Sequence, residues 1–285
     1  MSSRGNREAP EDKVTVPGLR SRKLGGEKIV ALTAYDYPSG LIADRAGVDV
    51  VLVGDSLANT ALGLENTLPV TLEEMLAALR AVRRGVRRAL LVADMPFGSY
   101  HAGEDKAVEA AIAFVKAGAE AVKLEGGSGR AALIARLVAS EIPVMGHIGL
   151  TPQSVLRMGG YRVQGKSPEA AAGIVEDAAA LESAGASSLV IEGVPSHVAA
   201  EITSRIEIPT IGIGAGPHCD GQILVFADLL GMLPGKKPRF ARKYLDFHAL
   251  ALEAVAVYRR DVLAGTFPSQ AETYDVANAL SPFPR

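Results

Sequence analysis

Polar side chains follow several short apolar runs of this sequence, at the points where predicted strands end. Side chains alternate along a strand, so Lys123 and Glu125 share one face while Leu124 takes the other. Where strands run parallel, their carboxyl ends meet at one edge, and polar residues at that edge are candidates for chemistry. These strand-end residues are Asp55, Ser56, Asp94, Lys123, Glu125, His147 and Glu192.

Two of the acids, Asp55 and Asp94, favour a magnesium site at this edge. Carboxylate oxygens without a His or Cys cluster are typical of Mg²⁺ rather than zinc. A 2-oxo acid would chelate such an ion through its carboxylate and keto oxygens, and the ion would stabilise an enolate. Removing the proton beside the keto group requires a positioned base, for which Glu192 is the candidate. The pattern indicates an Mg²⁺-dependent, enolate-forming lyase or transferase.

Each of these residues also has an ordinary structural explanation. An aspartate after a strand often caps the next helix, although no helical pattern directly follows Asp55 or Asp94. An ion pair with Glu125 would explain Lys123, because an unpaired buried charge is costly. His147 can be read as a satisfied core histidine, and Glu192 as a surface acid before a glycine.

The runs and the stretches between them predict alternating strands and helices. Between the runs, apolar residues fall at three- and four-residue steps, as a helix with one buried face requires. The runs themselves are nearly all apolar, which is typical of parallel strands covered by helices. Strands are expected within 28–36, 48–56, 88–97, 120–127, 142–150, 187–195 and 208–216. Helices are expected within 37–47, 71–86, 104–118, 128–140, 167–185, 195–206 and 238–264.

This alternation predicts a single-domain α/β protein, a TIM-type (β/α)8 barrel over residues 14–264. The eighth strand must come from 221–232, where too few residues precede it for a full helix. Either that helix is truncated, or the segment is itself helical and the sheet is open and doubly wound. No Gly-x-Gly-x-x-Gly opens the first helix, which disfavours a dinucleotide-binding open sheet. Residues 1–13 are expected to form a disordered tail, and 265–285 an extended one.

Composition agrees with one large domain. Of 285 residues, 48% are hydrophobic and 22% charged, and a barrel of this kind typically needs about 250 residues. The net charge of −2 argues against nucleic-acid and membrane partners. No apolar run approaches the roughly 20 residues of a membrane span. The single cysteine, Cys219, excludes an intrachain disulfide and favours a cytoplasmic location.

Six colinear motifs between about residues 14 and 260 resemble those of ketopantoate hydroxymethyltransferases. They are VGDSLANTALGLENTLPVTLEEM, ADMPFGSY, AVKLEGG, GHIGLTPQSVLRMGGYRVQGK, IEGVP and GIGAGPHCDGQILVFADLLG. The resemblance implies a barrel enzyme that converts 3-methyl-2-oxobutanoate to 2-dehydropantoate, with 5,10-methylenetetrahydrofolate as the one-carbon donor. This step opens the pantothenate branch toward coenzyme A.

The same resemblance implies roles for individual residues. Asp55, Asp94 and Glu125 look like ligands of Mg²⁺, and Glu192 resembles the base that removes the proton at C3. The substrate-binding set implied by the family comprises Asp55, Ser56, Asp94 and Lys123. The resemblance also implies a homo-oligomer, with a decamer as the expected assembly.

Two other functions remain open from the residues alone. A related Mg²⁺-dependent barrel lyase would cleave a 2-oxo acid without folate and use the same acids. A catalytically inactive barrel that serves as a scaffold would have lost a strand-end acid, and none is missing here.

Overall fold

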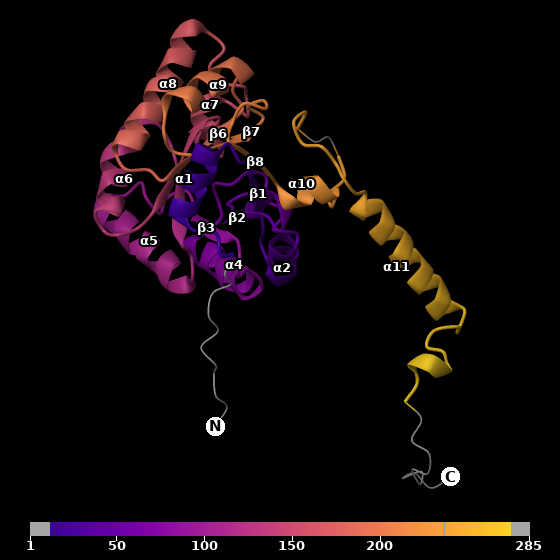
Figure 1. The fold of residues 1–285 in the computed structure, drawn as a ribbon. Helices are drawn as coiled ribbons and strands as arrows, with labels where there is room; N and C mark the ends of the chain where they lie inside the picture. Colours follow the sequence, from indigo (N-terminus) through magenta and orange to yellow (C-terminus); the bar gives the residue numbers. More distant parts are fainter. Residues whose placement is uncertain (1–11, 236–237, 275–285) are drawn as a thin grey trace, which may run out of the picture.

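Eight parallel strands close into a barrel in sequence order (Figure 1). The structure is a computed structural model in which residues 12–235 and 238–274 are described. The strands are β1 (Ile29–Thr33), β2 (Val50–Val53), β3 (Leu90–Asp94), β4 (Ala121–Glu125), β5 (Val144–Gly149), β6 (Ser188–Glu192), β7 (Thr210–Ile213) and β8 (Gly221–Leu224). The predicted barrel is confirmed, and the open doubly wound sheet is excluded.

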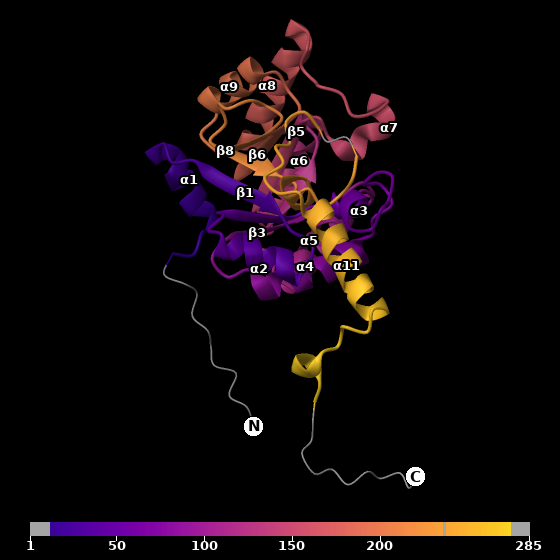
Figure 2. The ribbon, with the colours of Figure 1, turned by 90° about the vertical axis from the view of Figure 1, so that its right-hand side faces the viewer.

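Helices precede, connect and follow the strands, and Figure 2 shows the same barrel from a second side. They are α1 (Val16–Gly25), α2 (Tyr37–Arg45), α3 (Leu57–Thr60), α4 (Leu72–Gly85), α5 (Glu104–Ala117), α6 (Ala131–Val138), α7 (Val155–Met158), α8 (Pro168–Ser183), α9 (Ser196–Arg205), α10 (Phe226–Leu230) and α11 (Phe247–Leu263). Short 3-10 turns lie at Ser128–Arg130, Pro152–Ser154 and Gln270–Glu272. Helix α4 shows how the sequence determines such a helix. Thr71 and Glu74 form the capping box at its start, and Met75, Leu79 and Val82 are buried on one face.

The strands separate two apolar layers. Alternate residues, such as Val51 and Leu91, pack outward against the helices, while Val50, Leu90 and Val92 fill the barrel interior. The same alternation turns the final residues of β3, β4 and β6 into the interior at its carboxyl end. The alternation of side chains that builds the core therefore also directs these strand-end acids into the same end of the barrel interior.

Helix α1, which the sequence patterns did not predict, closes the opposite end of the barrel. Leu19 of α1 is 1% exposed and packs with the interior side chains of the strands. Lys23, from the same helix, donates to the carbonyls of Thr203 and Ile208 and pairs with Asp220 at 3.0 Å. These partners precede β7 and β8, so α1 is fastened across the amino ends of the strands.

The connection between β7 and β8 contains no helix within the described residues 214–220. The helix before β8, which the sequence suggested is truncated, is thus missing from these described residues. The eighth strand lies inside the expected segment 221–232. Part of the outer wall is left uncovered here. Val30, which pairs in register with Gln222 of β8, points outward from β1 with 53% of its surface exposed.

Helix α11 stands away from the barrel in Figure 1, and none of its residues is buried. The expectation of a helix over 238–264 was wrong at its start. The helix begins only at Phe247, where the Asp246 side chain accepts from Ala249 N and caps it. The described helices include none that is long and apolar enough to cross a membrane.

The two predicted tails lie largely outside the described residues. Of the N-terminal segment 1–13, only residues 12 and 13 are described, and of the C-terminal segment 265–285, only 265–274. The short turn Gln270–Glu272 interrupts the described part of the second segment.

Candidate active site

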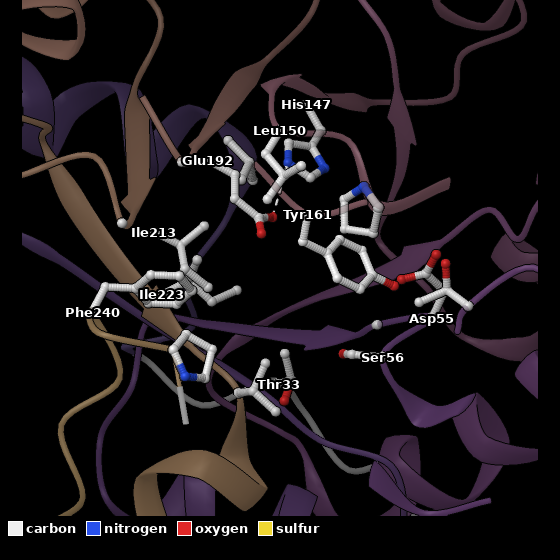
Figure 3. Close-up of a pocket in the computed structure, with 18 of the residues that line it drawn as sticks. Thr33, Asp55, Ser56, His147, Leu150, Tyr161, Glu192, Ile213, Ile223 and Phe240 are labelled. Carbon is white, nitrogen blue, oxygen red and sulfur yellow. Dashed lines mark ion pairs between the residues drawn. The ribbon is translucent and has the colours of Figure 1, made fainter. Parts of the chain in front are cut away.

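A cavity of about 540 Å³ opens at the carboxyl ends of the strands (Figure 3). Every strand-end residue singled out from the sequence lines it: Asp55, Ser56, Asp94, Lys123, Glu125, His147 and Glu192. Strand register brings several of them side by side, because Asp94 pairs with Lys123, Glu125 with His147, and Gly149 with Glu192. The prediction that the strand-end residues converge at one end of the barrel is confirmed.

The two aspartates lie against each other at the floor of this cavity. The backbone N–H of Asp55 donates to Asp94 Oδ2 at 3.2 Å, and both side chains are buried. Burial raises the pKa of both carboxyl groups, and the charge of Asp94 raises that of Asp55 further. Their negative charge is therefore incompletely compensated by the protein.

Lys123 supplies positive charge next to this pair. Its Nζ lies 2.7 Å from Asp94 Oδ1 and 3.8 Å from Glu125 Oε1. Burial alone would lower the pKa of the ammonium group, but the charges of Asp94, Glu125 and Asp55 outweigh burial and raise it. Lys123 is thus a permanent cation. The ion pair with Glu125 that would explain Lys123 on structural grounds is present, but Asp94 lies closer to Lys123 than Glu125 does.

His147 bridges two acids and is more than a core histidine. Its Nδ1 lies 3.4 Å from Glu125 Oε1, and its Nε2 lies 3.2 Å from Glu192 Oε2. Burial and the Lys123 charge lower the pKa of the imidazole, but its contacts with Glu125 and Glu192 prevail and raise it to about 9. The raised pKa favours the protonated ring between the two carboxylates, although Lys123 Nζ also lies 3.4 Å from its Nδ1.

Glu125 is fixed by three neighbours. Besides His147 and Lys123, the backbone N–H of Gln153 donates to its Oε2 at 2.9 Å. Burial raises the pKa of this carboxyl, yet the contacts with His147, Lys123 and Gln153 outweigh burial and lower it. Glu125 is accordingly an ionised anchor of the cluster.

Gln153 and Tyr100 complete the floor, and neither was identified from the sequence. The Gln153 side-chain amide donates to Asp55 Oδ2 and to the carbonyl of Met95, both at 3.0 Å. The Tyr100 hydroxyl donates to Gln153 Oε1 at 2.5 Å. Tyr100 lies in a turn and Gln153 in the short 3-10 turn Pro152–Ser154, where no long helix or strand period marks a side chain as pointing inward.

Ser56 lies on the side of the cavity near β1. Its hydroxyl is 2.8 Å from that of Tyr35, which in turn accepts from Thr33 Oγ1 at 2.8 Å. Figure 3 shows Ser56 beside Asp55, with Glu192 on the far side of the cavity. A small ligand between these residues would meet an acid on either side.

The donor set suits one divalent cation. Lys123 and His147 contact the carboxylates of Asp94, Glu125 and Glu192, whereas Asp55 has no ion pair among the described residues. Asp228, Arg162 and Arg239 also line the cavity. Among the described residues no three His, Cys, Asp or Glu side chains are arranged as a metal-binding group. Mg²⁺, however, commonly takes one or two protein carboxylates and fills its other positions with water and substrate oxygens. Asp55 and Asp94 meet that requirement, and Glu125 lies beside them.

Several known proteins are similar to this chain over most of its length. Residues 13–270 match the family model of ketopantoate hydroxymethyltransferase. A 3-methyl-2-oxobutanoate hydroxymethyltransferase of Koribacter versatilis is 55% identical over 263 residues, covering 92% of this chain and 89% of that protein. The protein of the same name from Thermotoga maritima is 54% identical over 261 residues, covering 92% and 96%.

Solved structures with a similar fold are more distant in sequence. A phosphonopyruvate hydrolase in complex with oxalate and Mg²⁺ superposes with a TM-score of 0.59 at 16% identity, covering 92% of both chains. A 2,3-dimethylmalate lyase of the PEP mutase/isocitrate lyase superfamily gives 0.54 at 18% identity, covering 90% and 91%. At such identities the likeness concerns the fold alone.

Proposed function

The chain belongs to the ketopantoate hydroxymethyltransferase family, and from this premise we propose that it transfers a hydroxymethyl group from 5,10-methylenetetrahydrofolate to 3-methyl-2-oxobutanoate. The product is 2-dehydropantoate, and water supplies the hydroxyl oxygen as tetrahydrofolate leaves. Family membership implies a place in pantothenate biosynthesis. The folate donor, the metal and the enolate route are parts of the proposal.

The observation that carries the proposal is the position of Glu192 opposite Asp55 across one cavity (Figure 3). A 2-oxo acid has two ends of different chemistry, a chelating pair of oxygens and a carbon that bears an acidic proton. With its oxygens toward Asp55 and Asp94, its C3 would face Glu192. The carboxylate of Glu192 would accept the C3 proton, and His147 would hold that carboxylate in place through Nε2.

Asp55 and Asp94 would hold Mg²⁺, which as a Lewis acid would favour the enolate by drawing charge onto the keto oxygen. Lys123, 2.7 Å from Asp94, would add a fixed positive charge for the substrate carboxylate. Ser56 would contact the substrate from the neighbouring wall. The inclusion of Glu125 among the ligands stays a prediction, since both of its oxygens already face other groups in this structure.

Exchange of the C3 hydrogen of 3-methyl-2-oxobutanoate in D₂O, with Mg²⁺ and without folate, tests the first half of the reaction. We expect exchange by the wild-type protein and a loss of about 100-fold or more in Glu192→Gln, the usual scale for removing a general base. Wild-type protein without exchange, or a variant that exchanges normally, would overturn the assignment of the base. Exchange without product after folate addition would favour the folate-independent lyase.

We also propose that the protein is a homo-oligomer, and a decamer is the assembly that the family implies. Helix α11 exposes apolar side chains that include Leu250, Leu252 and Val255, each more than half exposed. The uncovered outer wall at Val30 is a second apolar surface. Light scattering on the purified chain should give a multiple of the single-chain mass, and a monomer at micromolar concentration would contradict this proposal. The single buried cysteine is compatible with a cytoplasmic location.

A further inference from the structure

Tyr161 reaches into the cavity from the segment between α7 and α8. We call residues 159–165 of this segment the tyrosine loop. Figure 3 shows the Tyr161 ring between Glu192 and Asp55, with its hydroxyl directed toward Asp55. This is the space that a substrate must use to face both acids, so the tyrosine and the substrate compete for one position.

The loop is attached at its ends and free in its middle. Gly160 N donates to the Val155 carbonyl at 3.1 Å, and Gln164 N donates to the Gly193 carbonyl at 2.8 Å. Between these two points, the described residues give the backbone of 161–163 a single hydrogen bond, from Gln164 Nε2 to the Arg162 carbonyl. The second attachment is to the residue that follows Glu192, which links the loop to the proposed base.

Glycines at both ends give the loop its conformational freedom. Gly159, Gly160 and Gly165 all have positive φ, at 65°, 118° and 69°. A Cβ at Gly159 or Gly160 would meet no atom within 4 Å, so lack of space is not the reason for glycine at these positions. The reason is the positive φ, which residues with a side chain rarely adopt. These glycines are therefore the points at which a backbone rotation would move the tyrosine.

The side chain is not locked into its present position. Tyr161 is 52% exposed, and its hydroxyl makes no hydrogen bond to any of the residues that the structure describes. The phenol hydroxyl is a hydrogen-bond donor at neutral pH. It lies inside the cavity without a bonded acceptor among the described residues, so it is available to donate to the carboxylate of a bound 2-oxo acid.

We propose that Tyr161 is a substrate-positioning residue on a hinged loop. Its ring leaves the space between Glu192 and Asp55 when the 2-oxo acid enters, then covers the bound acid and donates a hydrogen bond to the acid's carboxylate. The cover restricts the access of water to C3 while the acid is bound, so that exchange at C3 competes less with attack on the one-carbon donor. This inference rests on the proposed function, because it takes the 2-oxo acid as the ligand.

A single introduced tryptophan reports the movement, since the chain has none of its own. The variant Tyr161→Trp should change its emission when 3-methyl-2-oxobutanoate is added with Mg²⁺, with a midpoint equal to the dissociation constant from calorimetry. Tyr274→Trp, at a position that is 99% exposed, is the control and should not respond. An unresponsive Tyr161→Trp protein that still binds the acid calorimetrically would overturn the movement.

Kinetics separate the hydroxyl from the ring. Tyr161→Phe should raise KM for the oxo acid about tenfold at nearly constant kcat, as loss of one hydrogen bond to a charged group predicts. Tyr161→Ala should also increase the number of C3 exchanges per product formed, because water reaches the carbanion. A purely structural tyrosine would leave that ratio unchanged. If wild-type protein neither binds nor exchanges the acid, the proposed function fails; if it does both and these variants behave as wild type, only the role of Tyr161 fails.

Discussion

The side-chain amide of Gln153 donates to Asp55 Oδ2 at 3.0 Å, joining residues 98 positions apart in the chain. The backbone N–H of the same glutamine donates to Glu125 Oε2. One residue from the loop after β5 thus orients an acid from the end of β2 and another from the end of β4. Two carboxylates at the floor of the cavity are therefore oriented by Gln153, a residue that carries no charge.

Gln153→Ala should weaken Mg²⁺ binding about 10- to 100-fold, the range for removing a residue that orients a metal ligand. The Tyr100 hydroxyl would also lose its acceptor, which should lower the free energy of unfolding by about 1–3 kcal/mol. Calorimetric Mg²⁺ titration and urea unfolding measure the two effects. Gln222→Ala, at a glutamine outside this cavity whose side-chain amide donates to the Gly216 carbonyl, is the matched control. Unchanged Mg²⁺ affinity in Gln153→Ala would show that Asp55 needs no such orientation.

Asp55→Asn and Asp94→Asn should each sharply reduce Mg²⁺ affinity. Either change removes one of the two carboxylates that would face the ion, and it leaves an amide of the same size. Isothermal titration with MgCl₂ measures the loss. Asp177→Asn, at an acid outside this cavity that accepts from Ser128 N, is a suitable control. If both Asp55→Asn and Asp94→Asn titrate as wild type, neither aspartate holds the metal.

His147→Gln should lower kcat more than it raises KM. The cation between Glu125 and Glu192 disappears, and the Glu192 carboxylate loses the contact that fixes its direction. Removing one member of a buried charge cluster also typically lowers the free energy of unfolding by about 3–5 kcal/mol. Steady-state kinetics and chemical denaturation on the same preparation test both effects. A variant with normal kcat would show that Glu192 is oriented by other contacts.

Leu19→Ala should lower the free energy of unfolding by about 2–5 kcal/mol, as expected for a leucine removed from a packed core. The affected site is the amino end of the barrel, far from the carboxylates, so kcat at temperatures where the protein is folded should stay the same. Leu24→Ala on the same helix is the control, because that side chain is 78% exposed. Equal stability of the two variants would mean that α1 does not seal the barrel.

The strand-end residues could be predicted from the sequence because a strand has a period of two residues. Once the runs were identified as parallel strands, the positions of Asp94, Lys123, Glu125 and Glu192 in one cavity followed. The assignment of Mg²⁺ to these acids stays a prediction. The acids suggested a 2-oxo acid as the substrate class. Its identity as 3-methyl-2-oxobutanoate and the folate donor came from the family resemblance, since a lyase would use the same acids.

Loop residues escaped prediction for a physical reason. Gln153 and Tyr161 take their directions from turn geometry after β5, which has no repeat in sequence. The interaction of His147 with two acids depends on register between separate strands. Helix α1, by contrast, left readable signals: Thr15 caps its start, a proline follows at Pro17, and Gly26 ends it with φ of 70°.

Helix α1 and the packed side chains of the interior close the amino end of the barrel, so ligands reach the carboxylates from the carboxyl end. In the proposed reaction, a metal on Asp55 and Asp94 would lie deepest, the oxo acid above it and the folate outermost. A folate that returned before the product had left would then cover the product. Ordered binding is therefore expected of this architecture, although the chemistry alone does not require it.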